Sequence, residues 1–356
     1  MQLASRFSSL SATALTRRFV LGWLIVVLSV VALVAYFMHA SFEQQRQRTL
    51  LEVENLSMLL ERDVAANLEK VDLVLRSAID EYVGLAEKGA VDSSSVDRFL
   101  VRQRDRLKPL VAIRIANAAG EVILGTDGGT GSSAMIEDRD YFRQLRADPA
   151  SGLLISKPIQ GRISGKWAIV LARRLPDVDG KFSGIALASV GLEFFGQQFA
   201  ALQMGARGSV AMRAPDLALL ARVPWNDAVA DYGSTKISQD FQAALAANPL
   251  VGVYVAGATS IDGIRRLHAY RFNPDYRFYI NVGVPEDFYL APWWQQFYGV
   301  LALLALFLVL SGGTVYLLHG YASRLGERER MLRTIFDTSD GAIFLVDPAE
   351  IGRAHV

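Results

Sequence analysis

Two long apolar segments lie near the two ends of the chain. Residues 19–37 and 297–318 contain no charged side chain, and at about 1.5 Å per helical residue each is long enough to cross a hydrocarbon core of about 30 Å. A cleaved signal peptide is the alternative for the first segment. The segment is longer than a signal-peptide core of about 7–15 residues, and Tyr36 to His39 make a poor cleavage site. We therefore expect transmembrane helices at residues 19–38 and 293–318.

Basic residues flank the two apolar segments on the sides that face the chain termini. They are Arg6, Arg17 and Arg18 before the first segment, and Arg324, Arg328, Arg330 and Arg333 after the second. Positive charge marks the cytoplasmic side of a span, so residues 1–18 and the other terminus are expected in the cytoplasm. Residues 39–292 then lie outside it, with Trp293, Trp294 and Tyr298 as an aromatic anchor at the outer edge of the second span.

A long amphipathic helix is predicted directly after the first span. Neither Gly nor Pro occurs between Trp23 and Val83, and apolar residues recur every three or four positions. They are Val53, Leu56, Leu60, Val64, Leu68, Val71, Leu75, Ala78, Tyr82 and Leu85. Residues 39–88 therefore form a stalk helix, which packs on its own domain and is also long enough to pair with a second copy in a homodimer.

The pattern then changes to short β-type runs, and their order occurs twice. The first half has strands at 111–115, 121–124, 153–159, 167–175 and 182–190, with a helix from Asp138 to Arg146. The second half has strands at 209–213, 218–223, 252–258, 266–272 and 277–284, with a helix at 240–247. This repeat predicts two copies of one α+β module, at residues 89–204 and 205–292.

Composition excludes several classes of function. The chain has no cysteine, which excludes disulfides, thiolate metal sites and thiol nucleophiles. Its net charge of +1, without a long basic run, gives no footprint for nucleic acid. Its 4 histidines lack metal-ligand spacing, and the Gly128-Gly129-Thr130-Gly131 loop lacks the Lys of a P-loop. We expect no catalytic residues, no metal and no cofactor in this chain.

Several short motifs occur in an order that resembles a double Cache domain. In the first module they are Asp138-Arg139-Asp140-Tyr141-Phe142, Ile155-Ser156-Lys157-Pro158-Ile159, Gly165-Lys166-Trp167, Arg173-Arg174 and Asp179-Gly180-Lys181-Phe182-Ser183-Gly184; in the second, Ser260-Ile261-Asp262-Gly263, Arg266-Leu267 and Ala269-Tyr270-Arg271. The resemblance is to the type found in front of diguanylate cyclases and sensor histidine kinases. It implies an α+β fold of two tandem PAS-like (Cache) modules on a long N-terminal helix, flanked by two transmembrane helices. The location implied is the bacterial inner membrane, with the sensor domain in the periplasm.

The resemblance also implies a binding site for a small molecule in the membrane-distal module, at 89–204. Arg139 matches an Arg that grips a ligand carboxylate, Tyr141 and Phe142 match an aromatic pair, and Ser189 stands where amino-acid-binding members have an Asp. An ammonium buried without an acidic partner is costly, so a small anionic metabolite is expected rather than an α-amino acid. The side chains of Ser156, Lys157 and Trp167 are expected to line the same cavity.

Alternatives to these site assignments stay open in the sequence. Arg139 could pair with Asp138 or Asp140 on the helix surface, Lys157 could point to solvent, and Trp167 could belong to the core. Arg114, between Ile113 and Ile115, faces away from both of them, toward either a pocket or water.

The part after the second span resembles the start of a cytoplasmic signalling region. Residues 319–333 have the spacing of a coiled-coil connector, residues 334–350 resemble the opening of a PAS domain, and residues 351–356 resemble a translated sequencing adapter. The expected function is a transmembrane receptor that controls an output domain beyond this sequence. A diguanylate cyclase is the first expectation and a sensor histidine kinase the alternative. A chemoreceptor fits less well, because no HAMP module precedes the PAS-like start.

Overall fold

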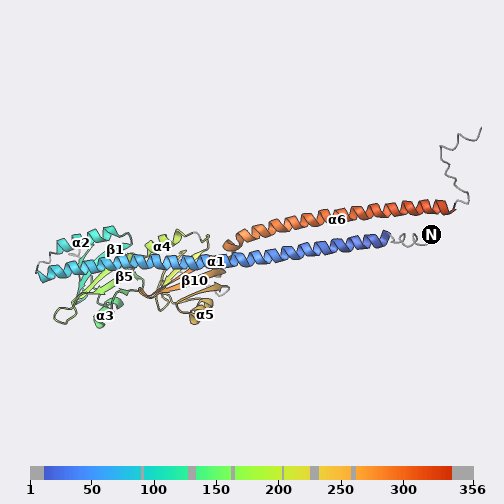
Figure 1. Cartoon of the computed structure of the whole chain (residues 1–356). Helices are drawn as coiled ribbons and strands as arrows, with labels where there is room; N and C mark the ends of the chain where they lie inside the picture. The colour runs from blue at the N-terminus through green and yellow to red at the C-terminus, as the bar shows by residue number, and fades with distance from the viewer. Residues whose placement is uncertain are drawn as a thin grey trace, which may run out of the picture. The chain divides into compact units, whose positions relative to one another are not determined.

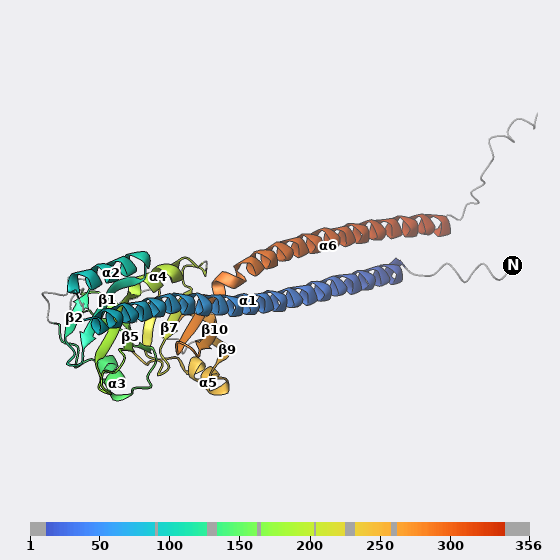
Figure 2. The same cartoon turned by 60° about the vertical axis from the view of Figure 1, so that its left-hand side comes forward.

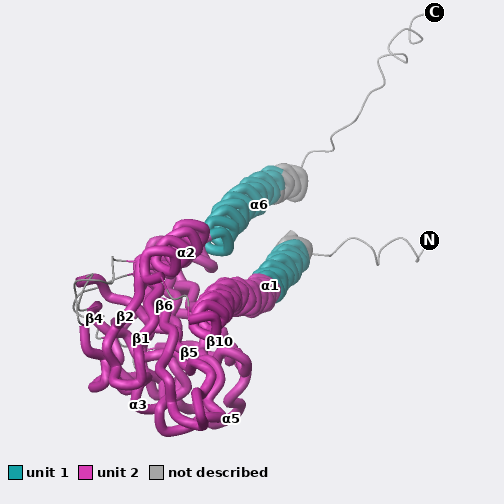
Figure 3. The backbone as a smooth tube through the Cα atoms, turned by 90° about the vertical axis from the view of Figure 1, so that its left-hand side faces the viewer, with its two compact units in different colours: residues 1–43, 292–356 teal, residues 44–291 magenta. Residues whose placement is uncertain are grey.

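The computed structural model describes residues 12–89, 92–126, 134–161, 165–202, 204–224, 232–257 and 262–338. The chain divides into two compact units, which are coloured separately in Figure 3. One unit comprises residues 1–43 and 292–356, and the other comprises residues 44–291. The Gly128–Gly131 loop, Ser260, Ile261, and the PAS-like and adapter-like residues from 339 onward lie outside the described residues.

Two long helices contain the apolar segments. Helix α1 runs from Ala12 to Glu87 and helix α6 from Glu286 to Thr338. Both are long and apolar enough to cross a membrane. Near the expected outer edge, the ring of Trp293 lies 5.3 Å from that of Phe42, and its Nε1 donates to the carbonyl of Met38 at 3.4 Å. The predicted continuation of each apolar segment into a long helix is confirmed.

The distal module contains a six-stranded antiparallel sheet. Helix α2 (Ser93–Arg106) precedes β1 (Leu110–Asn117) and β2 (Val122–Gly125), and α3 (Asp140–Ala147) precedes β3 (Leu154–Ile155), β4 (Ile159–Gln160), β5 (Trp167–Arg174), β6 (Gly184–Gly191) and α4 (Leu192–Ala200). The strand order is β2-β1-β6-β5-β3, and β4 also pairs with β5. The two central strands, β1 and β6, therefore come from opposite ends of the module's sequence.

The proximal module repeats this topology with five strands. They are β7 (Ser209–Arg213), β8 (Leu219–Val223), β9 (Val251–Ala256), β10 (Arg266–Asn273) and β11 (Phe278–Pro285), and α5 (Gln239–Ala247) precedes β9. The strand order β8-β7-β11-β10-β9 matches the distal order strand for strand. The predicted repeat of one α+β module is therefore confirmed.

Helices cover both faces of the two sheets. Figures 1 and 2 show α2 and α4 on one side of the sheets, and α3 and α5 on the other. Successive side chains of β5 point to opposite faces of the sheet. Ile169 and Leu171 pack in the core formed with α1, whereas Val170 and Ala172 pack with α3. Burial of each of the larger side chains, Ile169, Val170 and Leu171, stabilises the fold by about 1.5–3 kcal/mol relative to an exposed one.

The structure corrects some predicted elements. The strand expected at 153–159 is broken into β3 and β4, because Pro158 lacks the N–H that a continuous ladder requires. Helix α3 begins at Asp140 with Arg139 at the N-cap position, so Asp138 is not the cap. Helices α2 and α4 were not predicted; α2 buries only two residues, Val96 and Leu100, so its apolar periodicity is thin.

Candidate functional site

A small cavity lies between α3 and the face of the distal sheet that α3 covers. We call it the distal cavity. Its volume is about 40 Å³, which leaves room for about three non-hydrogen atoms, the size of a carboxylate group. Most of its wall is apolar, and its polar side chains come from separate elements. The main apolar residues are Val122, Ile136, Ile159, Val170 and Leu187; the polar ones are Arg114, Arg139, Tyr141 and Ser189.

Three of the seven predicted ligand-binding residues line the distal cavity. Arg139 lies at the N-cap of α3, Tyr141 lies in its first turn, and Ser189 lies on β6. In the described part of the chain, the Arg139 side chain makes no hydrogen bond or ion pair. Asp140 instead pairs with Arg143, at 2.6 Å. The structure thus brings the side chains of Arg139, Tyr141 and Ser189 together at this cavity. Their role in ligand binding stays a prediction.

Arg114 is the site residue that the sequence left undecided. It lies on β1 between the buried residues Ile113 and Ile115, which pack toward α1, so alternation places it on the opposite face, at the distal cavity. Alternation along the strand predicts that the Arg114 side chain points to the face opposite Ile113 and Ile115. Only the position of α3 over the sheet shows that this direction leads to a cavity rather than to water.

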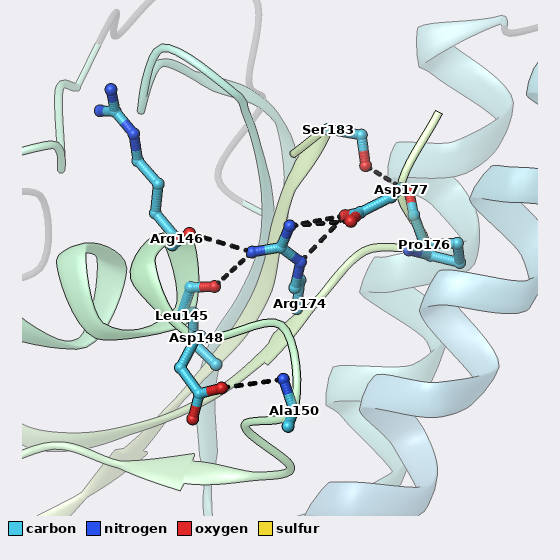
Figure 4. A network of polar contacts seen from close by, with 8 residues as sticks. All are labelled: Leu145, Arg146, Asp148, Ala150, Arg174, Pro176, Asp177 and Ser183. Atoms are coloured by element: carbon cyan, nitrogen blue, oxygen red, sulfur yellow. Dashed lines mark hydrogen bonds and ion pairs between the residues drawn. The ribbon is translucent and has the colours of Figure 1, made fainter. Parts of the chain in front are cut away.

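Helix α3 is held in place by Arg174, at the end of β5 (Figure 4). One guanidinium nitrogen of Arg174 donates to the carbonyls of Leu145 at 2.7 Å and Arg146 at 3.2 Å, in the last turn of α3. The other nitrogens pair with Asp177 at 2.9 and 3.0 Å, and the guanidinium lies 4.6 Å from the ring centre of Phe182. A cation that binds the last carbonyls stabilises a helix C-terminus. Arg174 therefore fixes the element that carries Arg139 and Tyr141.

Phe142 does not line the distal cavity. It is fully buried on α3, and its ring packs edge to face with Phe182 at 5.5 Å. It belongs to the core that joins α3 to the sheet, together with Leu145. The expected aromatic pair therefore divides into one cavity residue, Tyr141, and one core residue, because adjacent positions on a helix point about 100° apart.

Ser156 and Lys157 also lie away from the distal cavity. The Ser156 hydroxyl accepts a hydrogen bond from the backbone N–H of Val170 at 2.9 Å and donates to the carbonyl of Lys157 at 2.7 Å. Lys157 points outward and pairs at 2.8 Å with Asp216, in the β7–β8 turn of the proximal module. This hydrogen bond and the Asp216 charge raise the pKa of Lys157. Both residues serve the structure around β5 rather than the cavity.

Trp167 lies outside the distal cavity, at the start of β5. Its side chain is 44% exposed and lines a shallow groove beside Glu193 and Phe194 of α4. Its ring centre lies 5.1 Å from that of Tyr232. Trp167 therefore joins the two modules at the surface. It neither lines the distal cavity nor belongs to the core, which were the two alternatives in the sequence.

The charged side chains that line the distal cavity determine which ligand groups it can bind. Two guanidinium groups, from Arg114 and Arg139, line it, and no acidic side chain does so in the part of the chain that the structure describes. A guanidinium can grip a carboxylate through paired N–H donors, whereas a buried ammonium here would lack an acidic partner. The arrangement fits the carboxylate end of a small molecule.

Comparison with known proteins identifies the fold. No family model matches the chain, and no curated protein matches it. Among solved structures, the extracellular domain of rpHK1S-Z16, a candidate histidine kinase, is 29% identical; the match covers 68% of this chain and 96% of that one, with a TM-score of 0.58. The fold is that of an extracellular sensor domain.

Two chemoreceptors share this sensor fold at lower identity. The sensory domain of Campylobacter jejuni Tlp3 with isoleucine bound is 12% identical, with a TM-score of 0.51 over 69% of this chain and 96% of that one. The ligand-binding domain of Pseudomonas fluorescens CtaA in complex with L-isoleucine is 14% identical, with a TM-score of 0.51 over 70% and 97%. At these identities the likeness shows the fold alone.

Proposed function

We propose that this protein is a membrane-anchored receptor whose distal cavity binds the carboxylate end of a small anionic metabolite. The observation that carries the proposal is the pair of guanidinium groups, Arg114 and Arg139, in a mostly apolar cavity without an acidic lining residue among those described. The sensor fold of residues 44–291 and the two helices that are apolar enough to span a membrane support the receptor assignment.

The ligand class follows from what Ser189 can and cannot do. Its hydroxyl can donate to or accept from a ligand oxygen, but it supplies no charge for an ammonium group. The chemoreceptors with the same fold are described with bound amino acids, at an identity that shows the fold alone. We therefore assign a carboxylate without an α-amino group. Only its carboxylate enters the distal cavity, because a volume of about 40 Å³ has room for about three non-hydrogen atoms.

A homodimer is proposed from the exposed side of the stalk helix. Leu51, Leu59 and Leu73 on α1 are each about 60% exposed, and their positions fall within about 80° of one another around a helix. The opposite side of α1 is buried against the modules through Val64, Leu68 and other core residues. These exposed leucines, on the side of α1 opposite its buried residues, form a leucine stripe that supports pairing of α1 with the α1 of a second copy.

Two output classes are proposed for the region beyond the second span. The double Cache resemblance favours a diguanylate cyclase. The 29% identity to the extracellular domain of a candidate histidine kinase favours a sensor histidine kinase. Sequence beyond Glu350 separates them, because a GG[DE]EF stretch marks a cyclase and a phosphoacceptor histidine box marks a kinase.

A carboxylate screen tests the binding proposal. The whole chain in detergent is heated with single carboxylates of two to six carbons, with and without an α-amino group, at constant ionic strength. The proposal expects at least one non-amino carboxylate to raise the melting temperature in a saturable way. It is contradicted if none does, or if an amino acid does so and its deaminated counterpart does not.

A further inference from the structure

The proximal module has more polar side chains on the sheet face that is mostly apolar in the distal module. Strand alternation places Val210 and Met212 of β7 in the core with α1, so Arg213 lies on the other face. On β10, Leu267 likewise packs in that core, whereas His268 does not. These polar residues are nevertheless buried, and they line a second cavity of about 60 Å³ beneath α5, which we call the proximal cavity.

Three arginines and one aspartate line the proximal cavity. Arg266 on β10 is 2% exposed and pairs with Asp262 at 2.8 Å, and Arg222 on β8 donates to the same carboxylate at 3.2 Å. Burial, which alone would raise the pKa of Asp262, is outweighed by its hydrogen bond with Arg266 and by both arginine charges, and the pKa is lowered. Asp262 is therefore a carboxylate already shared by two guanidinium groups.

Arg213 is the third arginine and has a different environment. It is 5% exposed, and its guanidinium donates to three backbone carbonyls: Leu217 at 2.6 Å, Ser234 at 3.2 Å and Lys236 at 3.1 Å. No carboxylate pairs with it among the described residues. Burial and the nearby charge of Arg222 lower the pKa of Arg213 to about 10, so it remains a cation at neutral pH.

The remaining polar groups of the proximal cavity are neutral. Burial lowers the pKa of His268 to about 4, and its Nδ1 lies 3.1 Å from Oδ1 of Asn281. Nδ2 of Asn281 donates to the hydroxyl of Tyr254 at 2.7 Å. Burial raises the pKa of Tyr254, so this hydroxyl keeps its proton. No acceptor for that proton lies among the described residues, so Tyr254 is an available donor.

Charge and donors in the proximal cavity are thus unbalanced. Three guanidinium groups face one carboxylate, and buried charges without a partner of opposite sign are costly. We propose that the proximal cavity binds a small oxyanion, a carboxylate or a phosphate of about four to six non-hydrogen atoms, held by Arg213, Arg222 and the hydroxyl of Tyr254. The size follows from the 60 Å³ volume at about 10–15 Å³ per atom-sized occupant. The site is separate from the distal cavity and does not depend on it.

Titrations with acetate and with inorganic phosphate test this site. The whole chain in detergent is titrated with each, with ionic strength held constant by chloride, and the melting temperature and the calorimetric Kd are measured. We expect saturable stabilisation by at least one of the two, and the tighter one defines the ligand as a carboxylate or a phosphate. Arg222→Gln is expected to weaken binding about 10- to 100-fold, because a charge-assisted hydrogen bond is lost.

Three further variants keep the test decisive if Arg222→Gln does not fold. Tyr254→Phe removes one donor without changing charge and is expected to weaken binding severalfold. Arg265→Gln is the matched control, since Arg265 is 65% exposed, pairs with Glu286 and does not line the cavity; it should bind normally. Arg139→Gln, in the distal cavity, should leave binding at the proximal cavity unchanged. The proposal is overturned if neither anion binds, if Arg222→Gln and Tyr254→Phe bind as the wild type does, or if only Arg139→Gln loses binding.

Discussion

Arg173, on β5, donates a hydrogen bond of 2.9 Å from Nη2 to Oδ2 of Asp72, on α1. Its Nε contacts the other carboxylate oxygen, and the side chains are 20% and 9% exposed. The next residue, Arg174, points to the opposite face of the same strand and holds the last turn of α3. Two adjacent arginines thus link the stalk helix and the helix over the distal cavity to one strand.

Removal of Asp72 is expected to destabilise the chain strongly. Asp72→Ala leaves the largely buried guanidinium of Arg173 without its counter-ion, which should lower the free energy of unfolding by about 3 kcal/mol. Denaturant unfolding followed by tryptophan fluorescence measures the change. Asp80→Ala, at an exposed position on the same helix, should change it by less than about 0.5 kcal/mol. Equal effects for the two variants would show that the Arg173–Asp72 pair does not join α1 to the sheet.

Arg174 is expected to tolerate no simple replacement. Arg174→Ala loses the carbonyl contacts, the Asp177 pair and the packing on Phe182 and should cost about 2 kcal/mol of stability. Arg174→Lys should recover only part of this, because an ammonium cannot reproduce the planar, forked contacts. Arg143→Ala, on the exposed side of α3, is the matched control. Hydrogen exchange of residues 140–147 reports the loosening of α3 directly, and unchanged protection in Arg174→Ala would exclude the role described.

The buried His268 is expected to make stability depend on pH. Its pKa is about 4 in the folded chain, below the ordinary histidine value of 6.5, so the unfolded chain binds more protons between these values. Stability should therefore be fully present above about pH 6.5 and fall by about 3 kcal/mol as the pH drops to about 4. His268→Gln should reduce the slope of unfolding free energy against pH in this window. An identical slope in the variant would mean that the pKa of His268 is the same in the folded and the unfolded chain.

The leucine stripe on α1 is expected to lie at a dimer interface. Because the chain has no cysteine, Leu59→Cys introduces a unique thiol on this stripe. In membranes it should form a disulfide-linked dimer on mild oxidation, visible on a non-reducing gel. Ala150→Cys, at an exposed loop position away from α1, should not. Cross-linking of both variants to the same extent would indicate random collision rather than pairing of α1 helices.

Most of the fold could be predicted from periodicity. The change from three- and four-residue spacing to alternation located α1 and most strands, and the repeated order indicated two modules. The elements that were predicted wrongly or not at all have local causes. Pro158 divides a strand, α2 buries only two apolar residues, and Asp138 is near the helix start without capping it.

The candidate site was only partly predictable. Arg139, Tyr141 and Ser189 meet at one cavity because the helix start and β6 face each other, as the resemblance implied. Phe142, Ser156, Lys157 and Trp167 lie elsewhere, since short-range sequence does not determine which side of a strand end or helix turn faces the cavity. The proximal cavity was missed altogether, because its arginines come from β7, β8 and β10, and only the folded sheet brings β10 to the same face as the β7–β8 hairpin.

We propose that the guanidinium of Arg139 binds a ligand carboxylate in the distal cavity. Isothermal titration of the carboxylate that stabilises the wild-type chain most, against wild type, Arg139→Gln and Arg143→Gln, tests it most directly. Arg139→Gln is expected to weaken binding by at least about tenfold, while Arg143→Gln, one turn away on the exposed side of α3, should bind like the wild type. Equal affinity of wild type and Arg139→Gln for that carboxylate would contradict it.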